Sequence, residues 1–204
     1  MSDLDKLITL FESFPGIGAR QARRFAFHVL TMNDADNADL SRLIASIKNS
    51  VFECESCHRF STTYNKEKLC SICTSPNRDH SRLLVVERDS DVQAIERAGV
   101  YDGLYFVLGG TVPLLNSKDT EKLRAGALKA TVNTRLEDNL EEVILGFSVN
   151  PDGENTVRFV ESILEPILNE KNKKISHLGR GLSTGSELEY ADAETIKNAL
   201  KNRF

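Results

Sequence analysis

Arg82-Leu83-Leu84-Val85-Val86-Glu87 decides the fold class of this 204-residue chain. A short apolar run that ends in a carboxylate is typical of a buried strand. Downstream of it, strand-like runs at 104–108 and 142–147 alternate with helical stretches, one that ends at Gly99 and one that covers 155–169. This alternation predicts an open parallel sheet with helices on both faces.

Composition and charge are those of a folded cytosolic chain. Apolar residues make up 40% and charged residues 27%, which argues against disorder. No apolar run reaches the roughly 18 residues of a membrane span, and the segment 1–6 lacks the apolar stretch of a secretory signal, so we expect no membrane association and a cytoplasmic, nucleoid-associated location. The net charge of −4 excludes a uniformly basic nucleic-acid coat. Because the basic excess lies in the first 82 residues, we expect any DNA-facing surface there.

Upstream of the sheet, the four cysteines form two CxxC pairs, Cys54/Cys57 and Cys70/Cys73, with 12 residues between them. This spacing suits four thiolates around one tetrahedral Zn²⁺, which predicts one structural zinc ion per chain with no open coordination position. Three alternatives stay open: two reversible disulfides, an iron–sulfur cluster, and a c-type haem on Cys54-Glu55-Ser56-Cys57-His58. A cytosolic location disfavours the disulfides. The absence of an export signal disfavours the haem, and His58 is expected to be an exposed neighbour of the site.

The N-terminal part predicts a helix–hairpin–helix. Apolar residues recur at helical spacing in 4–11 and again in 22–30, and Phe14-Pro15-Gly16-Ile17-Gly18 breaks the pattern between them. Glycines allow a backbone to approach a phosphate closely, and the N–H groups of the following helix point toward the anion. A third helix, with an apolar stripe at Leu40, Leu43, Ile44 and Ile47, is expected after a polar linker at 33–39.

The second of these helices carries a basic face. Its arginines lie opposite the apolar stripe, where they face either a DNA backbone or solvent alone. Phe27 falls on the same polar side, either as an interface residue in self-association or as a residue at the boundary of the core. The candidate DNA-binding residues are Gly16, Gly18, Arg20, Arg23 and Arg24.

Three carboxylates form a further candidate site. Glu87 ends the first strand of the α/β block, and Asp152 and Glu154 follow a later strand. Since strand carboxyl ends line the functional crevice of an open α/β sheet, these acids could hold Mg²⁺ for phosphoryl chemistry. From spacing alone we favour the alternative, in which Asp152 and Glu154 cap the next helix and Glu87 pairs with an arginine. No phosphate-binding loop of the GxxxxGK[ST] type is present, so ATPase activity is not predicted.

The expected architecture is multidomain, with an α-helical part and an α/β part. The C-terminal segment from 175 predicts a strand, a glycine-rich loop and a final helix near 194–201. The predicted domains are a helix–hairpin–helix domain at 1–53, a four-cysteine zinc finger at 54–78, an α/β domain at 82–174 and the C-terminal segment at 175–204.

The order of these parts closely resembles the bacterial RecR family of recombination mediators over nearly the whole chain. The matching stretches are Phe14-Pro15-Gly16-Ile17-Gly18, Ala26-Phe27-His28, the two CxxC pairs, Val85-Val86-Glu87, Tyr105-Phe106-Val107-Leu108-Gly109-Gly110 and the segment 181–192. The resemblance implies that the α/β block is a Toprim domain. It also implies a homo-oligomeric ring, typically a tetramer, that encircles single- or double-stranded DNA. Members act with RecO and RecF to load RecA recombinase onto single-stranded DNA covered by SSB.

The resemblance also assigns residue roles. Arg20 and Arg24 match the positions that contact DNA, and Glu87 and Glu154 match acids at the partner- or DNA-facing surface. Asn150 stands where catalytic Toprim enzymes carry the first acid of Asp-x-Asp, and the 150–154 motif is two residues shorter than in the family. Both departures weaken a Mg²⁺ site and favour a non-catalytic scaffold. The rival hypothesis is a Toprim-type metal-dependent nuclease or topoisomerase-like enzyme that uses Glu87, Asp152 and Glu154.

Overall fold

The structure, a computed structural model, describes residues 1–62, 66–114, 120, 123–179, 191 and 193–201. The chain divides into two compact units, Met1–Val51 and Phe52–Phe204, each described here by itself. The glycine-rich part of the expected C-terminal loop, 181–190, lies outside the described residues. No helix in the described part is long and apolar enough to cross a membrane.

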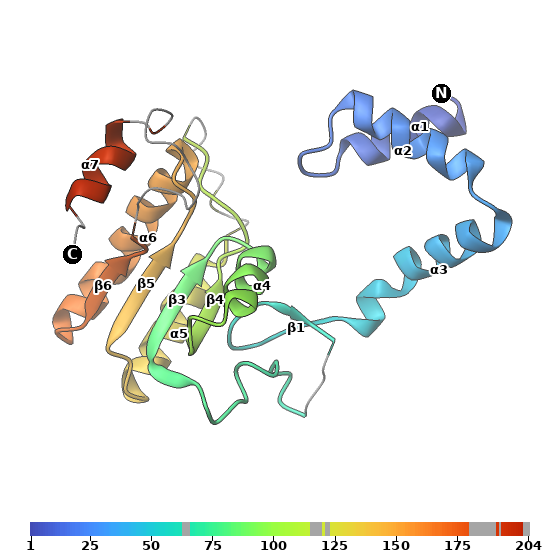
Figure 1. Ribbon diagram of the computed structural model, residues 1–204. Coiled ribbons are helices and arrows are strands. Elements are labelled where there is room, and N and C mark those ends of the chain that lie inside the picture. The colour runs from blue at the N-terminus through green and yellow to red at the C-terminus, as the bar shows by residue number, and fades with distance from the viewer. Residues whose placement is uncertain (63–65, 115–119, 121–122, 180–190, 192, 202–204) are drawn as a thin grey trace. The chain divides into compact units, whose positions relative to one another are not determined.

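The first unit consists of three helices: α1 (Asp3–Glu12), α2 (Ala19–Thr31) and α3 (Asp34–Ser50) (Figure 1). Ser2 caps α1, because its hydroxyl accepts a hydrogen bond from the Asp5 N–H at 3.1 Å. Asn33 caps α3 in the same way, through the Asp36 N–H at 2.9 Å. The polar stretch that we expected as a linker is therefore the capped first turns of α3.

The first unit buries little apolar surface. Ala22 and Ala26 of α2 are its only buried apolar residues, and α3 has no buried residue. Phe11 of α1 packs edge-on against Phe14 and against Phe25, each with ring centroids 5.8 Å apart. The two buried alanines and the packed phenylalanine rings hold α1 and α2 together as a hairpin.

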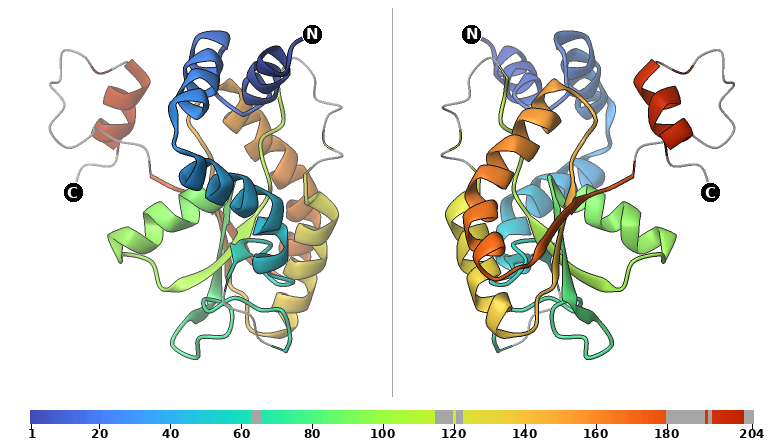
Figure 2. Two further views of the ribbon diagram at one scale, coloured as in Figure 1. Left: turned by 90° about the vertical axis from the view of Figure 1, so that its right-hand side faces the viewer. Right: turned by 90° about the vertical axis from the view of Figure 1, so that its left-hand side faces the viewer.

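The second unit is built on a four-stranded parallel sheet. Its strands are β3 (Asp79–Val86), β4 (Gly103–Val107), β5 (Glu142–Gly146) and β6 (Lys174–His177), in the order β4-β3-β5-β6. Its helices are α4 (Asp89–Ala98), α5 (Ala125–Glu137), α6 (Pro151–Glu170) and α7 (Ala193–Lys201). Figure 2 shows α4 on one face of the sheet and α5 and α6 on the other. The predicted fold class, helical part plus parallel α/β part, is confirmed.

The core lies where the strand pattern predicts it. The segment 83–86 is completely apolar and almost fully buried, because β3 is an inner strand covered on both faces. Val85 pairs with Phe106 of β4 on one side and with Leu145 of β5 on the other. Gly99 adopts the left-handed conformation, with a φ of 66°, and ends α4 as expected.

Two helices differ from expectation. α5 lies in a region for which the sequence predicted no element, and only Leu128 and Val132 of this helix are buried. α6 begins at Pro151 rather than at 155, because the Asn150 side chain accepts a hydrogen bond from the Gly153 N–H at 2.8 Å. The helix then continues past Pro166 to Glu170. Asp152 and Glu154 consequently lie in its first turn, where their charges interact favourably with the helix dipole.

Candidate metal centre and nucleic-acid interface

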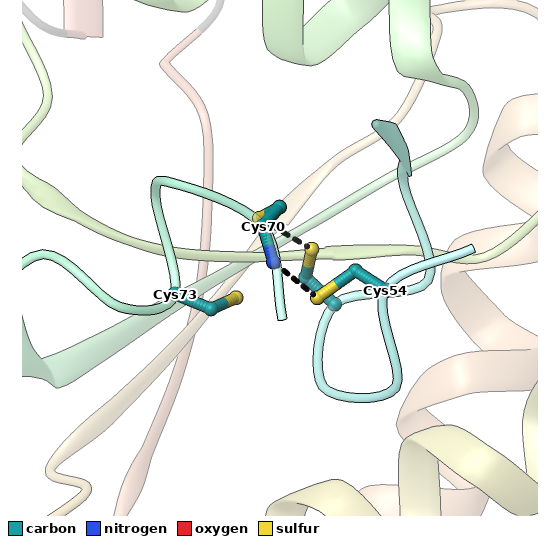
Figure 3. Close-up of side chains that lie close together, drawn as sticks. Cys54, Cys70 and Cys73 are labelled. Atoms are coloured by element: carbon teal, nitrogen blue, oxygen red, sulfur yellow. Dashed lines mark hydrogen bonds between the residues drawn. The ribbon is translucent and has the colours of Figure 1, made fainter. Parts of the chain in front are cut away.

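Four cysteine sulfurs converge in the second unit. Their Sγ atoms all lie within 4.8 Å of one another, and those of Cys57 and Cys70 are 3.6 Å apart. Figure 3 shows Cys54 on one segment of the chain and Cys70 and Cys73 on another. Cys54, Cys57 and Cys70 are completely buried and Cys73 is partly buried. The spacing of the two CxxC pairs therefore does bring four thiols to one point.

The arrangement fits a tetrahedral metal ion. Sulfurs held at about 2.3 Å from a central Zn²⁺ lie about 3.8 Å from one another, close to the separation of Cys57 and Cys70. All four cysteines are free, and 3.6 Å is far longer than the roughly 2.05 Å of a disulfide. The thiols are thus placed to share one ion, with no position left for a reacting ligand.

Proton sharing among the thiols also favours a cation. Hydrogen bonds from Cys57 and Cys70 lower the pKa of the Cys54 thiol, because they stabilise its thiolate. The pKa of Cys57 is raised, since ionisation would end its hydrogen bond to Cys54 and add a second buried negative charge. A divalent ion at the centre removes this conflict and allows all four thiols to ionise.

The turns around the cysteines are built by the backbone. The His58 N–H donates to the Cys54 carbonyl at 2.9 Å, and the Thr74 N–H donates to the Cys70 carbonyl at 3.1 Å, so each CxxC pair closes one tight turn. His58 adopts a φ of 59° directly after its pair. Its ring packs edge-on to Phe106 and its Nδ1 lies 2.7 Å from a carboxylate oxygen of Glu53. His58 is therefore a partly buried neighbour of the site and not a member of the metal-binding cluster, so only its expected exposure is wrong.

The four-cysteine module, the described residues among 52–73, is attached to the edge of the sheet. β1 (Phe52–Glu53) and β2 (Phe60–Ser61) form its small antiparallel ribbon. The Val107 N–H of edge strand β4 donates to the Cys57 carbonyl at 2.8 Å. This contact covers the end of the outer edge of β4, a strand whose five residues are all buried.

Side chains reinforce this attachment. The Phe60 N–H donates to a carboxylate oxygen of Asp89 at 2.7 Å. Arg124 forms an ion pair with Glu53 at 3.0 Å, and the Arg135 guanidinium donates to the Ser56 hydroxyl at 2.8 Å. Sequence reasoning missed these residues, because their partners lie far away in the chain and carry no spacing signal. The four-cysteine module and the packing of the sheet edge are therefore mechanically connected.

In the first unit, the glycine turn leaves the start of α2 open. Gly16 has a φ of 76°, which disfavours any other residue. Gly18 precedes α2 without a side-chain cap, and a Cβ atom there would meet no atom within 4 Å. The fold itself does not demand glycine at position 18. What glycine provides there is room beside the first backbone N–H groups of α2, those of Ala19 and Arg20, since the Gln21 N–H donates to the Gly18 carbonyl at 2.9 Å.

The basic face of α2 follows directly. Arg20, Arg23 and Arg24 are all exposed, and α2 contains no acidic residue. None of the three forms an ion pair within the described part of the chain, although Arg24 donates a hydrogen bond to Gln21 at 3.2 Å. Unpaired guanidinium groups beside open N–H groups form a surface that can bind phosphate.

The three candidate acids do not meet at one metal. The side chain of Glu87 is buried and accepts a hydrogen bond from the Ser148 N–H at 2.9 Å. A carboxylate oxygen of Asp152 accepts from the Leu114 N–H at 2.8 Å, and Glu154 is partly buried in the first turn of α6. Among the described residues, the four cysteines are the only group of three or more metal-binding side chains. Glu87 and Asp152 thus anchor loops at the carboxyl edge of the sheet.

A polar cluster near the amino ends of β3 and β4 was also missed by sequence reasoning. Arg78 pairs with Glu96, which accepts a further hydrogen bond from the Tyr105 hydroxyl at 2.6 Å. Burial raises the pKa of Glu96, but the hydrogen bonds from Arg78 and Tyr105 outweigh it and hold that pKa below its ordinary value. This cluster fixes α4 against the sheet.

The sequence matches three protein-family models. These are the helix–hairpin–helix of RecR over residues 4–48, a Toprim domain over 81–178 and the RecR C-terminal segment over 181–203. The matches define a Toprim protein with an N-terminal helix–hairpin–helix. The chain is 34% identical over 199 residues to the recombination protein RecR of Lactobacillus helveticus, covering 97% of this chain and 94% of the relative. It is 35% identical over 198 residues to that of Streptococcus thermophilus, again covering 97% and 94%.

A third relative gives the same result. The recombination protein RecR of Lactococcus lactis subsp. cremoris is 33% identical over 199 residues, which cover 98% of this chain and 95% of the relative. The chain belongs to the RecR family, and the resemblance inferred from its motifs is confirmed. Its place is among proteins of recombination and repair.

Proposed function

We propose that this protein is a non-catalytic DNA-binding scaffold of recombinational repair. In this proposal it acts in the cytoplasm, at the nucleoid, with RecO and RecF to load RecA recombinase onto SSB-coated single-stranded DNA. The observation that carries the proposal is the face of α2 that presents Arg20, Arg23 and Arg24 next to the open turn at Gly16 and Gly18. The family membership supports the same function.

One subunit offers only a few phosphate contacts, so we propose that several subunits repeat these contacts. A handful of phosphate contacts gives weak, salt-sensitive binding, whereas a closed ring repeats them and adds avidity. The exposed apolar stripe of α3 supports self-association, because Leu43, Ile44 and Ile47 are each 48% to 65% exposed. We propose a homo-oligomeric ring, tetrameric as in the family, closed partly through this stripe.

The four cysteines are proposed to hold one structural Zn²⁺ per chain. Zinc is the metal that an all-thiolate tetrahedral set favours. Bound there, it would keep the module 52–73 on the edge of β4, because Cys57 contributes both a thiolate and the carbonyl that bonds Val107. The zinc would supply rigidity and no reaction chemistry.

The function is tested by DNA binding over a salt series. We would measure the anisotropy of labelled single- and double-stranded DNA with the zinc-loaded protein in the presence of Mg²⁺. The double variant R20A/R24A should bind more weakly, with a salt slope reduced by about 0.7 per lost contact on single-stranded DNA. R42A is the control, since Arg42 is exposed on α3 and already paired with Asp39. Wild-type affinity of R20A/R24A in intact oligomers contradicts the proposal.

The same samples distinguish a scaffold from an enzyme. Recovered DNA should be intact on a denaturing gel, and adding RecO and RecF should accelerate RecA assembly on SSB-coated single strands. Mg²⁺-dependent cleavage that disappears in Glu87→Gln would instead establish the Toprim-type nuclease or topoisomerase-like activity.

A further inference from the structure

One exposed aromatic residue lies in the middle of the basic face of α2. The Phe27 side chain is 55% exposed, so it is not a residue at the boundary of the core. It follows Arg24 by three positions and Arg23 by four, which places all three on one face of the helix. Arg20 lies two turns before Phe27 on that face. The buried residues of α2, Ala22 and Ala26, lie on the other side.

Cationic, polar and apolar side chains surround Phe27. The same shallow hollow on α2 is also lined by Arg23, Arg24 and His28, by Gln21 and Thr31, and by the exposed Phe25. The arginines distinguish Phe27 from the exposed apolar residues of α3, which form a continuous apolar stripe of the kind that a second protein surface covers. A protein partner over Phe27 would have to desolvate or neutralise the arginines around it.

A nucleic acid strand is complementary both to the arginines and to the exposed aromatic ring. Its phosphates pair with guanidinium groups, and an unpaired base can stack on an aromatic ring. In a duplex the base faces are covered by their neighbours, so stacking on an exposed ring requires a single strand. Arginines and an exposed phenylalanine at helical spacing are therefore complementary to single-stranded DNA.

We propose that Phe27 is a stacking platform for an unpaired nucleobase and makes the basic face of α2 selective for single-stranded DNA. The proposal rests on the proposed DNA-binding function of this face and names the form of DNA that it prefers. Arg23 and Arg24 hold the backbone on either side of the base that contacts Phe27.

The test uses the absence of tryptophan from the chain. In the full-length variant F27W, residue 27 is the only tryptophan, and its fluorescence should be quenched by oligo(dT) but not by a duplex of equal length. L10W is the control, because Leu10 is 61% exposed on α1, outside the basic face. Its fluorescence should not respond to either DNA.

A second variant separates stacking from apolar burial. F27L keeps an apolar side chain and loses the aromatic face, so its affinity for oligo(dT) should fall roughly fivefold to a hundredfold while duplex affinity stays unchanged. Its oligomeric state, measured by light scattering, should equal that of the wild type. An emission maximum of F27W that is blue-shifted before DNA is added, with no quenching by oligo(dT), would show a contact between copies and overturn the proposal.

The outcome also separates this proposal from the function on which it depends. If R20A/R24A loses DNA binding but F27L binds oligo(dT) as the wild type does, the scaffold stands and the stacking platform is wrong. If neither variant changes binding, the basic face does not bind DNA and both are wrong.

Discussion

The two compact units place their apolar side chains in opposite ways. In Phe52–Phe204, four parallel strands and the cysteine module bury a continuous core that includes Val85, Phe106 and Leu145. In Met1–Val51, only two alanines are buried, while larger side chains such as Phe27 and Ile44 are more than half exposed. The second unit has the buried core and the four-cysteine cluster, which is where we propose that a metal ion adds to the stability of the fold. The first unit presents its side chains outward, which is what a binding surface requires.

The largest effect should come from removing the metal from the second unit. Metal-binding energy is folding energy in such modules, so Cys57→Ala should lower the free energy of unfolding by several kcal/mol. Hydrogen exchange should accelerate at the Val107 N–H, which bonds the Cys57 carbonyl. The measurements are zinc content per chain, thermal unfolding and amide exchange.

Ser71→Ala is the control, since Ser71 is exposed between Cys70 and Cys73. Helices α1 to α3 should keep their exchange rates in Cys57→Ala if the units are independent. If Cys57→Ala still held one zinc per chain and melted at the same temperature as the wild type, the four-cysteine cluster would not stabilise the second unit. The contrast drawn between the two units would then be wrong.

A smaller effect should follow from a single methyl group at the carboxyl edge of the sheet. A Cβ atom at Gly153 would lie 1.9 Å from the Ser148 carbonyl oxygen, so Gly153→Ala forces α6 away from the loop that also bonds Glu87. We expect a loss of about 1–3 kcal/mol in the free energy of unfolding.

Gly126→Ala is the matched control. Gly126 lies in α5, and a Cβ atom there meets nothing within 4 Å. Alanine should leave stability unchanged or raise it by about 0.4–1 kcal/mol. Urea unfolding measures both variants, and equal stability of the two would contradict the close approach seen at Gly153.

The smallest effect on folding is expected in the first unit. Ile44 is 65% exposed on α3, so Ile44→Ala should change the unfolding free energy of the isolated chain by less than about 0.5 kcal/mol. If the stripe is covered by another copy, the loss of stability should grow with protein concentration, because association stabilises by mass action.

Thermal unfolding at several concentrations, together with light scattering, checks this expectation. A loss above 2 kcal/mol at the lowest concentration would mean that Ile44 is covered within its own chain. The contrast between the two units would then be wrong.

Much of the fold was predictable, for an identifiable reason. Strands covered on both faces are continuous apolar runs, so β3, β4 and β5 could be located to within a few residues. The glycine turn between α1 and α2 and the end of α4 at Gly99 carry local conformational signals. α5 carries none, because it buries only Leu128 and Val132, and the start of α6 depends on the cap that Asn150 provides.

The sequence by itself determined the elements whose signals are local: the buried strands, the glycine turn, the arginine face of α2 and the spacing of two cysteine pairs. Only the tertiary structure decided which distant groups meet. It placed the cysteine module on the edge of β4, gave Glu87 and Asp152 backbone partners instead of a shared metal, and left Phe27 exposed among arginines. The physical reason is that periodicity and turn chemistry act over a few residues, whereas a contact between distant segments depends on how the whole chain packs.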